Sequence, residues 1–181
     1  MIIERIETER LVIRNFTPDD ANDLYEILGD AETMKHCEPA YDLKKTKDFL
    51  HSFCITRNGA VAAVHKQSQK VIGYILCNEI DPGIYEMGWF FNRRYWRQGY
   101  ATEACEAVLD HAFRDLHAHK VFAETLDGVK SVGLMQKLGM QFEGVQRGQT
   151  NSTDGSPASL YLYGLLAANW KPNQTHRVIS S

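Results

Sequence analysis

Apolar residues follow two different spacings along this chain, one typical of strands and one typical of helices, and segments with the two spacings alternate. Stretches in which every second residue, or nearly every residue, is apolar predict seven strands, at residues 8–15, 60–66, 71–79, 84–92, 120–125, 140–147 and 158–166. Apolar residues three and four positions apart predict helices at residues 18–28, 43–57, 99–116 and 129–138. Because strands and helices interleave without a repeat or a linker, we expect a single α/β (α+β) domain.

The same pattern indicates the centre and the boundaries of this domain. Residues 71–77 are apolar on both faces of their predicted strand, so we place this strand in the middle of a covered sheet. Residues 148–157 hold no residue that would enter a core, so we expect a mobile loop there. The segment after Trp170 is polar, so the domain is expected to span residues 1–170, followed by a polar C-terminal tail at residues 171–181.

The stretch from residue 84 to residue 116 combines a strand, a tight loop and a long helix. The first N–H groups of a helix have no partner within it, and they lie at the positive end of the helix dipole. Small residues at positions 99 and 101 would let an anion approach this backbone, and Arg94 and Arg97 add positive charge. The loop therefore suits a phosphate or pyrophosphate. An ordinary strand-turn-helix with a permissive glycine is the alternative.

The composition excludes several classes of protein. The chain has 181 residues and a formal net charge of −3. Its 44% apolar and 24% charged residues are typical of globular domains. This charge gives no reason to expect nucleic acid or an anionic membrane as a partner. No apolar stretch approaches the roughly 20 residues of a membrane span, and the first residues lack the basic and apolar regions of a signal peptide.

The cysteines and histidines are scattered. Cys37, Cys54, Cys77 and Cys105 form no C-x-x-C pair, and three of them lie within apolar patterns. We therefore expect reduced, mostly buried thiols in a cytoplasmic protein rather than a disulfide or zinc framework. The seven histidines form no triad or ligand spacing, so no metal site is predicted.

Three stretches point to a known family when they are taken together and in order. They are residues 8–14 with 18–21, the run Gly-Tyr-Ala-Thr-Glu-Ala at residues 99–104, and residues 131–147, which include Lys-Leu-Gly-Met at 137–140. With these stretches the chain resembles the GCN5-related N-acetyltransferases (GNAT). It resembles more closely the branch that acetylates the N-terminal alanine or serine of ribosomal proteins. The resemblance covers most of residues 8–170.

The resemblance implies a GNAT-like fold, with a mixed, twisted sheet of about seven strands flanked by about four helices. The central strands at 84–92 and 120–125 would run parallel, splay apart and hold acetyl-CoA in the gap. The pyrophosphate would bind backbone N–H groups of the loop, and the pantetheine would pair along the preceding strand. The cofactor-binding residues that this implies are Trp89, Phe90, Phe91, Arg97, Gln98, Gly99, Tyr100, Ala101 and Thr102.

The chain departs from the wider family at three positions. Trp96 stands where the acyl-CoA loop commonly opens with glutamine or arginine, although this is usual for the branch. Gly128 replaces an asparagine that commonly precedes the last helix, so a contact to the pantetheine arm is expected to be missing. Met135 replaces a frequent tyrosine general acid. Any proton donor must therefore be another group.

Two side chains are candidates for acetyl transfer, which needs a proton acceptor and a stabilised carbonyl oxygen. Glu86 is the candidate general base, acting through water, and the alternative is that it pairs with an arginine or holds a strand kink. Ser131 is the candidate to protonate the leaving thiolate or to hold the cofactor sulfur, and the alternative is a helix-start cap. A backbone N–H near Phe90 would hold the oxyanion. Glu103 and Cys105 are expected to be structural.

Together these expectations describe an acetyl-CoA-dependent N-acetyltransferase that transfers acetyl directly to a primary amine. The resemblance implies a ribosomal protein N-terminus as acceptor, entering between the first two helices and the loop at residues 148–157. A polyamine, an amino acid or a drug is the alternative acceptor, and a non-catalytic acyl-CoA sensor is the alternative to an enzyme. No direct contact with nucleic acid or membrane is expected, and the chain would be a monomer or homodimer.

Overall fold

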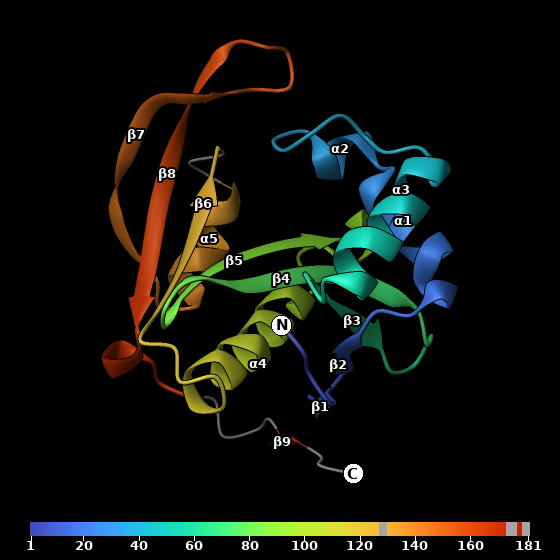
Figure 1. Ribbon diagram of the computed structural model, residues 1–181, viewed down its shortest axis with the longest axis horizontal. Helices are drawn as coiled ribbons and strands as arrows, with labels where there is room; N and C mark the ends of the chain where they lie inside the picture. The colour runs from blue at the N-terminus through green and yellow to red at the C-terminus, as the bar shows by residue number, and fades with distance from the viewer. Residues whose placement is uncertain (127–129, 173–176, 179–181) are drawn as a thin grey trace.

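One twisted β-sheet runs through the molecule, with helices on both of its faces (Figure 1). The computed structural model describes residues 1–126, 130–172 and 177–178, and within them the strand order is β7-β8-β6-β5-β4-β3-β2-β1-β9. The strands are β1 (Ile6–Glu7), β2 (Leu11–Asn15), β3 (Val61–His65), β4 (Val71–Asp81), β5 (Ile84–Phe91), β6 (Lys120–Thr125), β7 (Gln141–Asn151), β8 (Pro157–Leu166) and β9 (Arg177–Val178). The helices are α1 (Ala21–Leu28), α2 (Ala31–Met34), α3 (Leu43–Phe49), α4 (Tyr100–Arg114) and α5 (Lys130–Lys137).

The seven predicted strands all form, and the two-residue strands β1 and β9 extend the sheet beyond β2. β9 lies in the predicted polar tail. The loop predicted at residues 148–157 is shorter than expected, because β7 and β8 stay paired as far as Asn151 and Pro157. The prediction ended the strand at residue 147 because residues 148–151, Gly-Gln-Thr-Asn, include no apolar residue, so no apolar alternation marks them as strand.

Each face of the sheet carries its own apolar core, and β4 contributes to both. Tyr74 belongs to the core under α1, α3 and the π-helix Leu50–Thr56 that continues α3, whereas Ile75 belongs to the core under α4 and α5 on the opposite face. The prediction that this strand lies centrally, with both faces covered, is confirmed. Within the described ranges, no helix is long and apolar enough to cross a lipid bilayer.

Helix α4 packs along the sheet through the apolar stripe that its sequence predicts. Cys105, Val108 and Leu109 are 0% exposed. A fully buried Val or Leu side chain stabilises a fold by about 1.5–3 kcal/mol, so this stripe anchors the helix firmly. As a result the beginning of α4, at Tyr100, is held at a set distance from the end of β5. Both of these elements belong to the stretch in which the sequence predicts a ligand.

An ion pair fastens β2 to the first helical turn that follows it. Arg14 Nη1 and Nη2 lie 2.7 and 2.8 Å from the two carboxylate oxygens of Asp20, and the Thr17 backbone N–H donates to the same carboxylate at 2.7 Å. Burial by itself would raise the pKa of Asp20, but these hydrogen bonds outweigh it and hold the pKa below its usual range. The carboxylate therefore remains charged and stabilises the entry into α1.

Asp20→Asn is expected to lower the free energy of unfolding by about 2 kcal/mol near neutral pH, since hydrogen bonds to charged groups contribute about 1.5–3 kcal/mol. Because the folded-state pKa is depressed, this contribution is complete above about pH 4 and is lost as the pH falls through the folded-state pKa. Urea unfolding should therefore show a difference in free energy of unfolding between the two proteins that becomes smaller at acidic pH. Asp19→Asn, at the exposed neighbouring position, is the matched control. A difference in free energy of unfolding that does not change with pH would contradict a charged, stabilising Asp20.

Candidate active site

The parallel strands β5 and β6 separate part of the way along their length. They pair from Ile84↔Lys120 to Glu86↔Phe122, and there the pairing stops. Beyond this point β6 remains paired with β8, and β5 remains paired with β4. Figure 1 shows β6 turning away from β5. We call the end of this pairing the fork, and it confirms the expected splay of the central parallel strands.

Past the fork, one edge of β5 is open. Residues 87–91 pair with β4 on one side, and no strand of the described ranges pairs with them on the other. Such an edge presents N–H and C=O groups to which an extended molecule can bond, as peptides do when they add to a sheet. Trp89, Phe90 and Phe91, which are predicted to contact the cofactor, lie along this edge. Phe91 is 4% exposed, so its ring belongs to the core and only its backbone faces the gap.

Glu86 lies at the fork itself. The residue is half-buried, and within the described part of the chain its carboxylate has no hydrogen-bond or ion-pair partner. The alternative of a structural pairing with an arginine is therefore not seen. Burial raises the pKa of Glu86, and the charge of Glu124 raises it further. A half-buried, unpaired carboxylate with a raised pKa has the properties of a proton acceptor near neutral pH.

Glu124 is a residue of this site that the sequence did not single out. It lies on β6, two residues beyond Phe122, which pairs with Glu86. Residues two apart on a strand share a face, so Glu124 and Glu86 lie on the same face of the sheet. The alternation of buried Val121 and Ala123 with more exposed neighbours indicates the polar face of β6. The parallel register with β5 was needed to bring the two carboxylates together.

The loop at residues 97–102, here called the cofactor loop, joins the end of β5 to α4. Gly99 adopts φ +84°, and α4 begins at the next residue. The Glu103 N–H donates to Gly99 O at 3.0 Å and makes the first hydrogen bond of the helix. The N–H groups of residues 100–102 come before this first hydrogen bond, so they have no acceptor within the helix. Arg97 also has a left-handed backbone, with φ +58°, a conformation that is costly for a residue other than glycine.

Trp96, where the chain departs from the wider family, connects the cofactor loop to the strand before it. Its indole Nε1 donates to the backbone oxygen of Phe91 at 2.7 Å. Gln98 Nε2 donates to the backbone oxygen of Arg94 at 2.9 Å, which tightens the turn between them. The geometry of the loop is therefore set by its own side chains as well as by its glycine.

The last predicted catalytic region is only partly described. Ser131 belongs to α5 by its backbone, and its side chain lies outside the described part of the structure, as does the whole of Gly128. Met135 is 1% exposed and packs in the core with α4. A buried thioether has no proton to donate, so this position does not supply a general acid.

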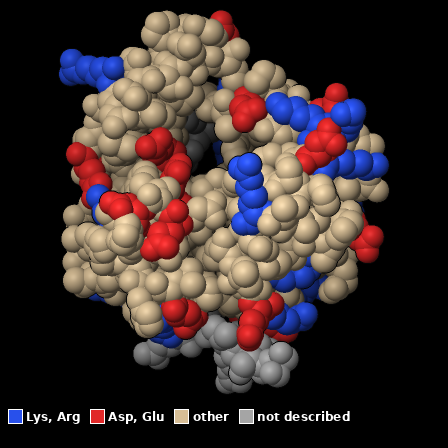
Figure 2. Space-filling view, in the orientation of Figure 1, with Lys and Arg blue, Asp and Glu red and all other residues tan. Residues whose placement is uncertain are grey.

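A hollow lies between two sides of the molecule, one formed by β6, α5, β7 and β8 and the other by α1, α2 and α3. Figure 2 shows this hollow, with acidic side chains beside it. The turn between β7 and β8 reaches across to the end of α2, where Thr153 Oγ1 donates to Lys35 O at 3.0 Å. The hollow is therefore framed by the first helices and by the β7–β8 turn, the segments that the resemblance implies would frame the entrance for an acceptor.

The buried thiols offer no nucleophile. Cys105 is completely buried on α4, and burial raises the pKa of its thiol well above the usual value. The nucleophilic form of cysteine is the thiolate, which this raised pKa disfavours. Cys105 is therefore part of the core, as predicted. Among the described residues no cysteine forms a disulfide, and no group of three His, Cys, Asp or Glu side chains gathers as around a metal ion.

Comparison with known proteins agrees with this architecture. The model of the acetyltransferase (GNAT) domain family matches residues 10–141. An uncharacterized N-acetyltransferase of Bacillus subtilis, YnaD, is 30% identical over 142 residues, which are 77% of this chain and 84% of that protein. The crystal structure of a GNAT-family acetyltransferase from Bacillus anthracis is 25% identical, with a TM-score of 0.83, and the match covers 91% of this chain and 99% of that one.

A more distant solved structure is that of a ribosomal-protein-S5-alanine acetyltransferase from Vibrio fischeri. It is 19% identical with a TM-score of 0.75, and the match covers 93% of this chain and 99% of that one. A likeness at this level of identity shows the shared fold. It says nothing about which amine this chain acetylates, because one fold serves many acceptors.

Proposed function

Because the chain belongs to the GNAT acetyltransferase family and is an acetyl-CoA-dependent N-acetyltransferase, we propose that it transfers acetyl directly to a primary amine. The N-terminal α-amine of a ribosomal protein is the acceptor that we propose first. The observation that carries the proposal is the carboxylate of Glu86 at the fork, which has no hydrogen-bond or ion-pair partner among the described residues and whose pKa is raised by burial. In a site where an amine must lose a proton, this is the described group best placed to receive it.

The residues around the fork fit acetyl-CoA. The N–H groups at the start of α4 and the left-handed Gly99 suit a pyrophosphate, which matches the family's use of a helix N-terminus. The open edge of β5 at Trp89, Phe90 and Phe91 suits the amides of a pantetheine arm. We therefore keep both groups of residues, 89–91 and 97–102, as the proposed cofactor-binding residues.

The proposed reaction needs few groups from the protein. Acetyl-CoA supplies the activated acetyl group. The amine nitrogen attacks the carbonyl carbon, so that a C–N bond forms and the C–S bond breaks, and Glu86 accepts the proton that the nitrogen loses, directly or through water. A backbone N–H near Phe90 stabilises the oxyanion. The thiolate that leaves takes up a proton, for which Ser131 remains the proposed donor.

The acceptor is proposed from the sequence and from the shape of the molecule. The runs at residues 8–14, 99–104 and 131–147 resemble the ribosomal-protein branch, and the hollow beside the fork is framed by α2 and the β7–β8 turn. A small amine, such as a polyamine, is the second candidate, because acidic side chains lie beside this hollow. We place the reaction in the cytoplasm, where the free thiols stay reduced.

Incubation with isotopically labelled acetyl-CoA is expected to add one acetyl group to peptides that begin with alanine or serine. Intact-mass spectrometry measures the transfer, and the release of free thiol measures its rate. Spermidine and peptides with a blocked N-terminus are the comparison acceptors. Transfer to spermidine but not to free peptide N-termini would favour the second candidate. Binding of CoA without thiol release above hydrolysis, for any amine, would contradict catalysis and favour a sensor.

A further inference from the structure

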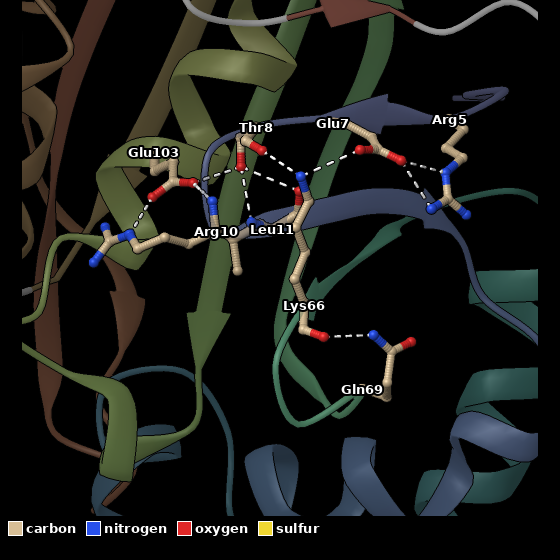
Figure 3. A network of polar contacts seen from close by, with 8 residues as sticks. All are labelled: Arg5, Glu7, Thr8, Arg10, Leu11, Lys66, Gln69 and Glu103. Carbon is tan, nitrogen blue, oxygen red and sulfur yellow. Dashed lines mark hydrogen bonds and ion pairs between the residues drawn. The ribbon is translucent and has the colours of Figure 1, made fainter.

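The turn between β1 and β2 lies against the cofactor loop, about ninety residues further along the chain (Figure 3). The Thr8 backbone N–H and Leu11 O close this turn at 3.0 Å. Arg10 leaves the turn and reaches across to the beginning of α4. The two segments are far apart in sequence, so their contact is a product of the tertiary fold.

One guanidinium group holds both sides of Gly99. Arg10 Nη1 donates to Gln98 O at 2.9 Å, on the residue before the glycine. The Arg10 guanidinium carbon lies 4.2 Å from the centre of the Tyr100 ring, on the residue after it. Such a cation–π contact adds about 0.5–1 kcal/mol when it is exposed. The planar group therefore restrains the cofactor loop at the position where its backbone must expose N–H groups.

Glu103 fixes the position of Arg10. The Arg10 Nε lies 2.7 Å from Glu103 Oε2, while Glu103 Oε1 accepts from the Arg10 backbone N–H at 2.7 Å and from Thr8 Oγ1 at 2.5 Å. The side chain of Glu103 is 12% exposed and that of Arg10 is 37% exposed, so water screens this pair only in part. Burial alone would raise the pKa of Glu103, but these hydrogen bonds lower it and keep the carboxylate charged.

The cofactor loop has a strained backbone, which needs contacts from outside the loop to keep its conformation. Arg97, with φ +58°, and Gly99, with φ +84°, lie on either side of Gln98, whose carbonyl oxygen Arg10 holds. A left-handed residue other than glycine costs of order 1–3 kcal/mol and persists only where its surroundings impose it. The contact with Arg10 is part of what imposes it here. Loss of this contact would leave the loop free to adopt other conformations.

We propose that Arg10 is a positioning residue that holds the cofactor loop ready for the pyrophosphate before the cofactor binds. It acts through the Gln98 carbonyl, the Tyr100 ring and Glu103, and it does not touch the reacting atoms. This inference rests on the proposed function and assigns the preparation of its anion site to a residue of the β1–β2 turn. Preorganisation of this kind raises affinity by reducing the cost of ordering on binding.

Arg10→Ala is expected to raise the dissociation constant for CoA by about 10- to 100-fold, because hydrogen bonds to charged groups have about this strength. Isothermal titration with CoA, on protein shown to be folded by circular dichroism, measures it. The maximal rate at saturating acetyl-CoA should stay within about twofold, since the chemistry is untouched. Arg10→Lys keeps the charge but lacks the planar fork, so it should recover only part of the affinity.

Arg5→Ala is the matched control. Arg5 lies just before β1, and its substitution removes the same charge, but the Arg5 side chain pairs with Glu7 and has no contact with the cofactor loop (Figure 3). The affinity of Arg5→Ala for CoA should equal that of the unaltered protein. If Arg10→Ala does not fold, Glu103→Gln gives the same test, because it removes the charge that holds Arg10, and it should also weaken CoA binding.

The outcomes separate this inference from the function on which it rests. An unaltered affinity for CoA in folded Arg10→Ala, or a fall in maximal rate without a change in affinity, would overturn the role of Arg10 alone. A loss of affinity that Arg10→Lys restores in full would show a charge effect, which would also overturn it. Failure of the unaltered protein to bind CoA would refute the proposed function, and this inference with it.

Discussion

Replacing Glu86 with glutamine is expected to lower the maximal rate of acetyl transfer by about 10²- to 10⁴-fold, the usual contribution of a general base. The amide has almost the same shape but cannot accept the proton. Affinity for CoA should change by less than about twofold, because the cofactor loop is untouched. Burial and Glu124 raise the pKa of Glu86, so the rate of the unaltered enzyme should rise as the pH increases through this raised value. Glu86→Gln should lack this rise.

The pH–rate profile at saturating acetyl-CoA is the measurement that decides. Glu124→Gln provides the same substitution at the neighbouring carboxylate. It removes a negative charge that raises the pKa of Glu86, so the rise in rate should move to lower pH while the maximal rate is largely kept. If the profile of Glu86→Gln keeps the same shape and height as that of the unaltered enzyme, Glu86 has no part in the mechanism.

Substitution of Gly99 by glutamate is expected to abolish measurable CoA binding, with a rise in the dissociation constant of at least about 100-fold, or ~2.7 kcal/mol. The backbone at φ +84° disfavours any residue with a Cβ, and the added Cβ would lie 3.2 Å from Arg10 Nη2. The new carboxylate would also bring negative charge to a site proposed for a pyrophosphate. Thermal unfolding with and without CoA measures the effect, because a ligand that binds only the folded state raises the unfolding temperature.

Gly155 in the β7–β8 turn offers a control with the same strain. It adopts φ +82°, and nothing lies within 4 Å of a Cβ placed there. Gly155→Glu therefore introduces the same side chain and a similar backbone cost away from the cofactor loop. CoA should stabilise this variant as it does the unaltered protein. Undiminished stabilisation of Gly99→Glu by CoA would refute the pyrophosphate site.

The elements of the fold were predictable because their signals are local. The stripe of Cys105, Val108 and Leu109 on α4 follows directly from helical spacing, and β4 reads as central because both of its faces are apolar. The exposed end of the β7–β8 hairpin was missed for the same reason. Its residues are polar on both sides, so no alternation marks them as strand. Prediction from pattern works where apolar residues recur at a regular spacing and fails where an element has none.

The candidate site was predictable only in part. The cofactor loop could be proposed from the sequence because a glycine, small residues and arginines cluster within a few positions of a helix start, and the structure places that helix start at Tyr100. Glu86 was proposed as an acidic residue in a central strand, and its role stays a prediction. Arg10 and Glu124 were not assigned to the site, since nothing next to them in the chain marks them. Glu124 depends on the register of a parallel pair, and Arg10 depends on the packing of the β1–β2 turn against α4.

By itself, the sequence determined the order of strands and helices and the family, and it predicted a cofactor loop between the end of β5 and α4, because short-range spacing and short motifs carry that information. Only the tertiary structure decided that the separation of β5 and β6 begins after Glu86, that Glu124 raises the pKa of Glu86, and that Arg10 contacts the loop on both sides of Gly99. Each of these depends on contacts between segments far apart in the chain. Such contacts are set by the register of the sheet and by packing across it, which no local pattern records.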